Sequence, residues 1–142
     1  MEPLTFRLGK SQIEAPDSWT MLSHADDKVV LTSNQQQQAT ISLMRFEVEL
    51  NFEQFKTLCA AQIRAVQKAV PSAFVEPESP FQDRGAFGMF YFGGDKTTGQ
   101  IFFGYLSLAQ RELVTMFVEG FGVDPQAQGS DFSRFVKSLK RD

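Results

Sequence analysis

The stretch that most constrains the fold is GAFGMFYFGG, residues 85–94, in which aromatic side chains and a methionine stand between glycines. Side chains along a β-strand alternate between the two faces of its sheet. At that spacing one face carries Phe87, Met89 and Tyr91, and the other carries Ala86, Gly88, Phe90 and Phe92. Because neither face is polar, such a strand is either covered on both sides or presents an apolar binding surface.

The length and composition favour one domain that spans residues 1–142 and has a single core. Fifteen phenylalanines against one tryptophan and two tyrosines supply apolar area without a polar group, and this area has to be packed. The net charge of -3 comes from 14 basic and 17 acidic residues spread along the chain. We therefore expect no nucleic-acid partner.

The single cysteine, Cys59, rules out an intramolecular disulfide and is expected to be a buried core residue. The N-terminal sequence MEPLTFRLGK lacks the pattern of a signal peptide. No apolar run approaches the roughly 18 residues of a membrane span. These features predict a cytoplasmic protein that is not inserted in a membrane.

Alternating apolar and polar residues predict strands over much of the chain. LTFRLGKSQIEAP reads as a hairpin with its turn at Gly9 and Lys10, and PDSW as a turn before the next strands. A second hairpin pairs residues 28–33 with 39–48 across the polar NQQQQ. A three-strand meander follows later, in GAFGMFYFG, QIFFGYLSLA and ELVTMFVEGF, with turns at GDKTTG and QR.

Helical spacing predicts two helices. The first spans 51–70, where Asn51 can cap, Gln54 completes a capping box and Pro71 ends the helix. Its apolar stripe is Phe52, Phe55, Cys59, Ile63, Val66 and Val70. The second begins near Ser130 and carries Phe132, Phe135, Val136 and Leu139.

This order of elements predicts an α+β fold: an antiparallel sheet, one long helix after the early strands, a three-strand meander and a C-terminal helix. Two helices can cover only part of a large sheet. The apolar faces of the 85–94 strand are therefore candidates for an incompletely covered surface, with burial in the core as the alternative for any single phenylalanine.

The sequence contains no catalytic constellation. Ser23, His24 and Asp26 are chain neighbours, whereas a working triad is assembled by the fold. Metal-ligand spacings and a phosphate-binding loop are absent, and neither Glu47 with Glu49 nor Glu76 with Glu78 is marked as a catalytic pair. We therefore expect a binding protein with no catalytic residues, no metal site and no cofactor, rather than an enzyme.

Several strings resemble a known group of proteins: IEAPDSW, ATISLMR, AQIRAVQKAVPSAF and FVKSL. They are similar to the PsbP/Mog-like fold, within it to DcrB-type domains, and especially to the effector-associated (Eag-type) chaperones of bacterial type VI secretion. The resemblance implies a cytoplasmic chaperone that binds the N-terminal transmembrane helices of an effector protein and shields them until the effector is loaded on the secretion spike. It also implies a homodimer.

The resemblance further implies which residues contact the partner helices. Gln62 and Val70 of the long helix are eight residues apart and so lie on one helix face. The strands would contribute Thr40, Ser42 and Met44 from one strand and Val29 and Leu31 from the one before it. Val30 is the alternative to Val29 and Leu31, because no motif fixes the length of the intervening loop.

Two other functions stay open. The Phe-rich sheet could line a pocket for a small hydrophobic ligand or an enzymatic reaction. A relative that acts on a protein surface in a photosystem or cell envelope is a further alternative. A neighbouring gene for a large effector with paired N-terminal apolar segments would favour the chaperone.

Overall fold

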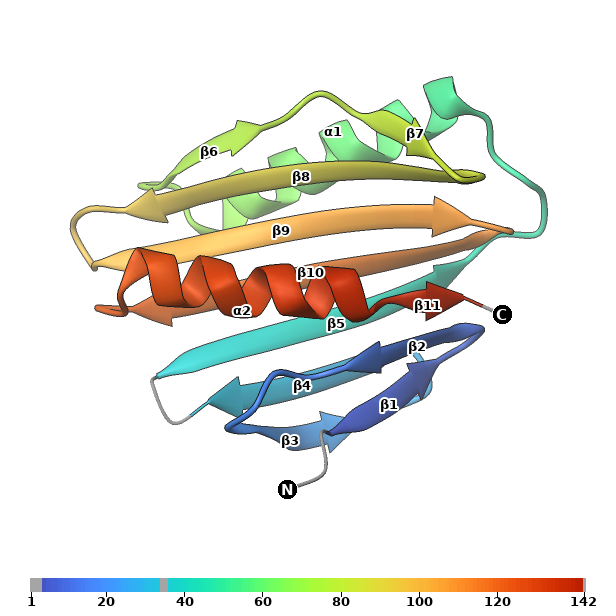
Figure 1. Cartoon of the computed structure of the whole chain (residues 1–142). Coiled ribbons are helices and arrows are strands. Elements are labelled where there is room, and N and C mark those ends of the chain that lie inside the picture. The colour runs from blue at the N-terminus through green and yellow to red at the C-terminus, as the bar shows by residue number, and fades with distance from the viewer. Residues whose placement is uncertain (1–3, 34–35, 142) are drawn as a thin grey trace.

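The computed structural model describes residues 4–33 and 36–141. Its middle layer is an antiparallel sheet with the strand order β3-β4-β5-β10-β9-β8-β6, in which β7 also pairs with β8 (Figure 1). These strands are β3 (Trp19–His24), β4 (Lys28–Ser33), β5 (Gln37–Arg45), β6 (Phe74–Pro77), β7 (Phe81–Asp83), β8 (Ala86–Asp95), β9 (Gln100–Ala109) and β10 (Glu112–Phe121).

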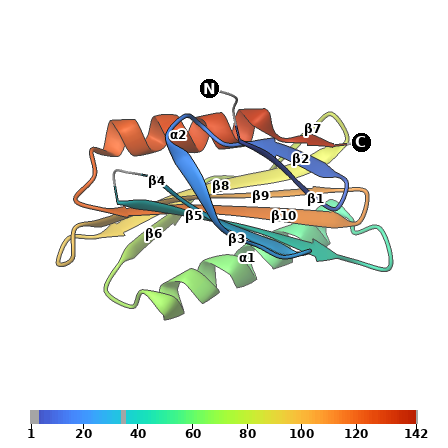
Figure 2. The ribbon, with the colours of Figure 1, turned by 90° about the horizontal axis from the view of Figure 1, so that it is seen from below.

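Two helices and a small sheet complete the molecule. The small sheet has the order β1-β2-β11, with β1 (Thr5–Leu8), β2 (Ser11–Glu14) and β11 (Lys140–Arg141). Figure 2 shows that α1 (Phe52–Ala69) lies on one face of the large sheet, while α2 (Pro125–Ser138) and the small sheet lie on the other. The predicted α+β fold, with its long helix, meander and C-terminal helix, is therefore confirmed.

The large sheet has a core on each face. The α2-side core joins the small sheet and α2 to β3, β4, β5 and β10, and includes the buried Trp19, Phe132 and Phe135. The α1-side core joins α1 to β8, β9 and β10 around the fully buried Phe55 and Phe102. The single core expected from the sequence is thus divided by the sheet.

The helix α1 forms as its sequence predicts. The side-chain oxygen of Asn51 accepts from the backbone N–H of Gln54 at 2.8 Å, and the Gln54 side chain accepts from the backbone N–H of Asn51 at 2.8 Å. This reciprocal capping box satisfies two backbone donors at the helix start. Cys59 is buried as expected, and burial raises the pKa of its thiol to about 12, so the thiol stays protonated.

The helix α2 begins at Pro125, not near Ser130 as predicted from its apolar spacing. Asp124 caps it by accepting from the backbone N–H of Gln126, and proline at the first helical position favours this start. The indole ring of Trp19 fixes the helix to the sheet. Its Nε1 donates to Asp131 at 3.0 Å, and its ring packs edge-on against Phe135 at a centroid distance of 5.0 Å.

The two apolar faces of the strand β8 are covered to different extents. Met89 and Tyr91 are buried in the α1-side core, so that face is covered. On the other face the ring of Phe81 lies over Gly88, where a Cβ atom would come within 2.5 Å of it. Coverage there is incomplete, since Phe92 remains 39% exposed.

Several short strands were not expected. The segment that includes VEPESP forms β6 and β7, which pair with β8 at an edge of the sheet. Trp19 opens the strand β3 directly after the predicted turn. The predicted strand over 39–48 spans Gln37–Arg45.

Candidate functional site

The α1-side face of the large sheet is covered over only half its width. The partners of α1 in the α1-side core lie mainly on β8 and β9, with Leu113 and Phe117 from β10. Beyond β10, the strands β5, β4 and β3 continue the sheet, and neither helix of the described residues packs on this side of them (Figures 1 and 2). We call this uncovered region, bounded by α1, the open face.

Strand alternation assigns the side chains of β5 to the two faces. Ala39, Ile41 and Leu43 are buried in the α2-side core. Thr40, Ser42 and Met44 therefore point to the open face, as predicted, and the Met44 side chain is 54% exposed. On β10 their register partners are Phe117, Thr115 and Leu113, which give this strip alternating polar and apolar character.

The placement of Val29 and Leu31 on this surface is wrong. Both are 0% exposed in the α2-side core, because they pair with Ile41 and Ala39 of β5, which face the same way. The residue between them, Val30, is half-buried and pairs with Thr40. Val30 therefore takes their place on the open face.

A hollow lies between the long helix and the sheet, at the border of the open face. Gln62 and Val70 line this hollow of about 310 Å³, together with Gln100, Phe117 and Glu119 of the sheet. Their predicted position on one face of the helix is confirmed. The structure thus brings Gln62, Val70, Thr40, Ser42 and Met44 to a single surface, since Thr40 pairs with Phe117 on the floor of this hollow.

Two side-chain pairs make the hollow partly polar. Gln62 is half-buried, and its Nε2 donates to Tyr91 Oη at 3.4 Å. Burial raises the pKa of Tyr91 to about 12, and the hydrogen bond from Gln62 offsets this rise only in part. The raised pKa keeps the phenol neutral. Gln100 Nε2 donates to Glu119 Oε1 at 3.4 Å. Burial raises the pKa of Glu119, and the Gln100 contact offsets this only in part.

Phe117 and Glu119 are not among the site residues predicted from the sequence, although the sequence contains a signal for them. In ELVTMFVEGF the set Val114, Met116 and Val118 is uniformly apolar. The intervening Leu113, Thr115, Phe117 and Glu119 mix apolar and polar side chains, as expected of a face that is only partly covered.

The raised pKa of Glu119 predicts a pH-dependent stability. The folded chain binds more protons than the unfolded chain between the ordinary and the raised pKa, so stability falls as pH rises through that window. We expect Glu119→Gln to remove this fall and to make the chain more stable above the window. Urea unfolding across the acidic to neutral range tests this, with the exposed Glu76→Gln as control. Identical profiles for wild type and Glu119→Gln would contradict it.

The remaining candidates for chemistry do not assemble into a site. His24 Nε2 lies 3.3 Å from the carbonyl oxygen of Arg7, at the exposed end of β3. Within residues 4–33 and 36–141, no three His, Cys, Asp or Glu side chains are grouped so that they could hold a metal ion. Among the helices of the described residues, none combines the length and apolar character needed to span a membrane.

Comparison with known proteins identifies the fold. No family model matches the sequence, and no curated protein matches it. The fold is similar to that of cyanobacterial PsbP (CyanoP) from Synechocystis sp. PCC 6803, with a TM-score of 0.70 and 10% identity over 94% of this chain and 87% of that chain. This chain has the PsbP-like fold.

A second solved structure with a similar fold comes from Pseudomonas aeruginosa. The protein of unknown function PA94 gives a TM-score of 0.55 and 12% identity, over 100% of this chain and 99% of that chain. At such identities the likeness shows the fold alone, because one fold carries many unrelated functions. The PsbP-like part of the predicted resemblance is therefore confirmed.

Proposed function

We propose that this chain is a non-enzymatic cytoplasmic chaperone or adaptor that binds the N-terminal transmembrane helices of a type VI secretion effector. Binding would shield these helices from water until the effector is loaded on the secretion spike. The observation that carries the proposal is the open face, a long sheet surface bounded by α1 and left without a covering helix. The resemblance of four sequence strings to Eag-type chaperones supports it independently.

The chemistry of the open face suits an apolar helix. Val30, Met44, Phe117 and Val70 supply apolar contacts along it, and their burial on binding is the main favourable term. A transmembrane helix is apolar enough to gain from such burial, and about 20 residues of it span roughly 30 Å.

Hydroxyl and amide groups alternate with these apolar residues. Thr40, Ser42 and Thr115 lie on the open face, and Gln62 projects from α1 into the hollow beside it. In a membrane, transmembrane helices associate through contacts with small and hydroxyl side chains and through hydrogen bonds between helices. The polar groups of the open face can substitute for those partners, so a serine or threonine on the bound helix need not be left unsatisfied.

The contribution of Gln62 can be tested with a matched pair of variants. We define a probe helix of about 20 leucine and alanine residues with one central serine and lysines at both ends. Gln62→Ala is expected to weaken binding of this probe by about 1 kcal/mol, roughly fivefold, through one lost hydrogen bond. Gln67→Ala, on the exposed side of α1, is expected to leave it unchanged. Titration calorimetry measures both.

The half-buried position of Gln62 requires a control on folding. Gln62→Ala removes the contact to Tyr91, so thermal unfolding of the variant should be recorded beside the titration. Equal affinities for wild type and Gln62→Ala, with both proteins folded, would remove Gln62 from the binding surface.

We also propose that the chain forms a homodimer, since self-complementary pairing is the commonest way for identical chains to cover a shared surface. Light scattering of the purified protein should then give twice the mass of the 16.0 kDa chain. The mass of one chain at tens of micromolar would contradict this.

A further inference from the structure

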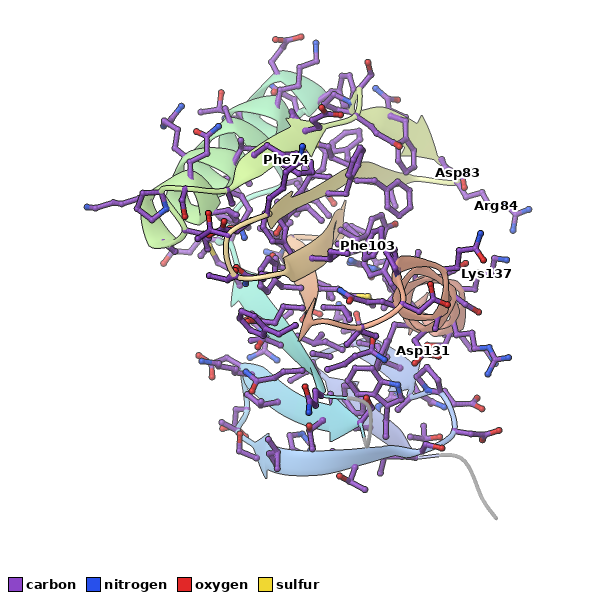
Figure 3. The ribbon with its side chains drawn as sticks, turned by 90° about the vertical axis from the view of Figure 1, so that its left-hand side faces the viewer. Phe74, Asp83, Arg84, Phe103, Asp131 and Lys137 are labelled. Atoms are coloured by element: carbon purple, nitrogen blue, oxygen red, sulfur yellow. The ribbon has the colours of Figure 1, made fainter. Side chains whose placement is uncertain are left out.

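A second apolar groove lies on the opposite face of the large sheet, between α2 and the strands β7 and β8. Its apolar part is a hollow of about 470 Å³ whose walls are Phe90, Phe92 and Phe103 from the sheet and Phe132 and Val136 from α2. Figure 3 shows Phe103 on the sheet beside α2, with Lys137, Asp83 and Arg84 on the same side of the molecule. The volume is within the range of small-molecule sites.

Stacked aromatic rings form the floor of this groove. Phe90 stacks on Tyr105 at a centroid distance of 4.5 Å and on Phe81 at 5.8 Å, and Phe103 stacks on Phe132 at 5.6 Å. Yet Phe81, Phe90, Phe103 and Tyr105 are each only half-buried. In a close-packed protein interior such rings would be covered on all sides. These four rings keep part of their apolar surface exposed, and a further apolar group could cover it.

A more polar hollow of about 630 Å³ lies next to the apolar hollow, and Val136 lines both. Arg84, Lys140 and Arg141 line this end, together with the acidic Asp83. Arg141 is held in place because its guanidinium donates to the backbone carbonyls of Ser107, Ala109 and Glu112.

Charge distinguishes this groove from the rest of the chain. Among the lining residues that the structure describes, Lys137 and the three basic residues at the polar end outnumber the acids Glu78 and Asp83. The whole chain, in contrast, has a net charge of -3. A local excess of positive charge beside an apolar floor is complementary to a molecule with an apolar body and an anionic end.

We propose that this groove binds a medium-chain acyl carboxylate. Its chain, of about a dozen carbon atoms, lies on the aromatic floor, and its carboxylate lies beside Arg84 and Lys140. An acyl carboxylate suits the site because the apolar hollow and the polar hollow share Val136 in their linings, so one extended chain can run from the aromatic floor to the basic residues. This site is separate from the open face, since the two lie on opposite sides of the sheet.

The test is calorimetric titration of the full chain with dodecanoate and with dodecanol, each below its aggregation concentration. We expect one dodecanoate per chain, bound about tenfold more tightly than the uncharged dodecanol. Ser133→Trp should fill the apolar hollow and abolish binding of both compounds. Ser130→Trp, one turn earlier on α2 and outside the groove, is the matched control and should bind as wild type.

A double variant tests whether the basic residues of the groove bind the carboxylate of the ligand, and it changes no packed residue. Arg84→Asn combined with Lys140→Gln removes two exposed charges, and asparagine tolerates the left-handed backbone at position 84, where φ is 52°. This variant should bind dodecanoate only as tightly as dodecanol.

The proposal is overturned by no binding of dodecanoate to wild type, by equal binding of dodecanoate and dodecanol, or by unchanged binding of dodecanoate to folded Ser133→Trp. Loss of dodecanoate binding in folded Val30→Asp, on the open face, also overturns it. The first three results do not bear on the binding of an apolar helix to the open face, so the two proposals can fail separately.

Discussion

Replacing Val30 with aspartate is expected to abolish binding of the probe helix, with a loss of affinity of a hundredfold or more. Val30 is half-buried at the centre of the open face, opposite Thr40 on the neighbouring strand. A bound apolar helix would bury the new carboxylate with no partner, at a cost of about 3 kcal/mol or more. Titration of the probe helix into wild type and variant measures the loss.

Two control variants separate this effect from general damage. Val30→Thr keeps the size and strand preference of valine and should bind within a fewfold of wild type. Gln126→Asp places the same charge in the first turn of α2, on the far side of the sheet, and should not change binding. If folded Val30→Asp binds the probe helix as wild type does, the helix does not bind on the open face.

Phe135→Ala is expected to destabilise the chain by about 3–5 kcal/mol, the usual cost of removing a fully buried phenylalanine side chain. Phe135 is 0% exposed and packs edge-on against Trp19, so its ring joins α2 to the edge strand β3 across the α2-side core. Losing this ring leaves a cavity that the strands of the sheet cannot close.

Urea unfolding followed by tryptophan fluorescence measures this loss, because Trp19 is the only tryptophan and contacts the deleted ring. The matched control is Phe121→Ala, since Phe121 is 46% exposed at the end of β10. We expect that variant to cost less than about 1 kcal/mol. Similar losses for the two variants would show that α2 is not docked through Phe135.

Strong local signals made the helices and long strands predictable. Asn51 and Gln54 form the capping box that their spacing indicates, and the alternating β9 and β10 pair through the two-residue turn at Gln110 and Arg111. Both of these turn residues have positive φ, as such tight hairpins require.

The face assignment of β4 could not be read from its sequence. Val29, Val30 and Leu31 are consecutive apolar residues, so either face of the strand could be the core face. Only the register with β5 decides it, by placing Val29 against Ile41. This register depends on contacts between the two strands, and it cannot be predicted from the length of the loop that joins them.

Other differences have a local cause. The start of α2 was readable from Asp124 and Pro125, a capping residue followed by proline, but the apolar spacing begins only at Phe132. The edge strand β6 was hidden because Pro77 and the following residues are typical of a loop. Its pairing with β8 became evident only in the folded chain.

The most direct test of helix binding on the open face is methyl NMR of the full chain during titration with the probe helix. We predict that the methyl signals of Val30, Met44 and Val70 shift together and saturate. The signals of Val29 and Leu31, buried behind the sheet, should shift far less. Shifts centred on Val136, in the groove beside α2, or no saturable shift at Val30 and Met44, would contradict this account.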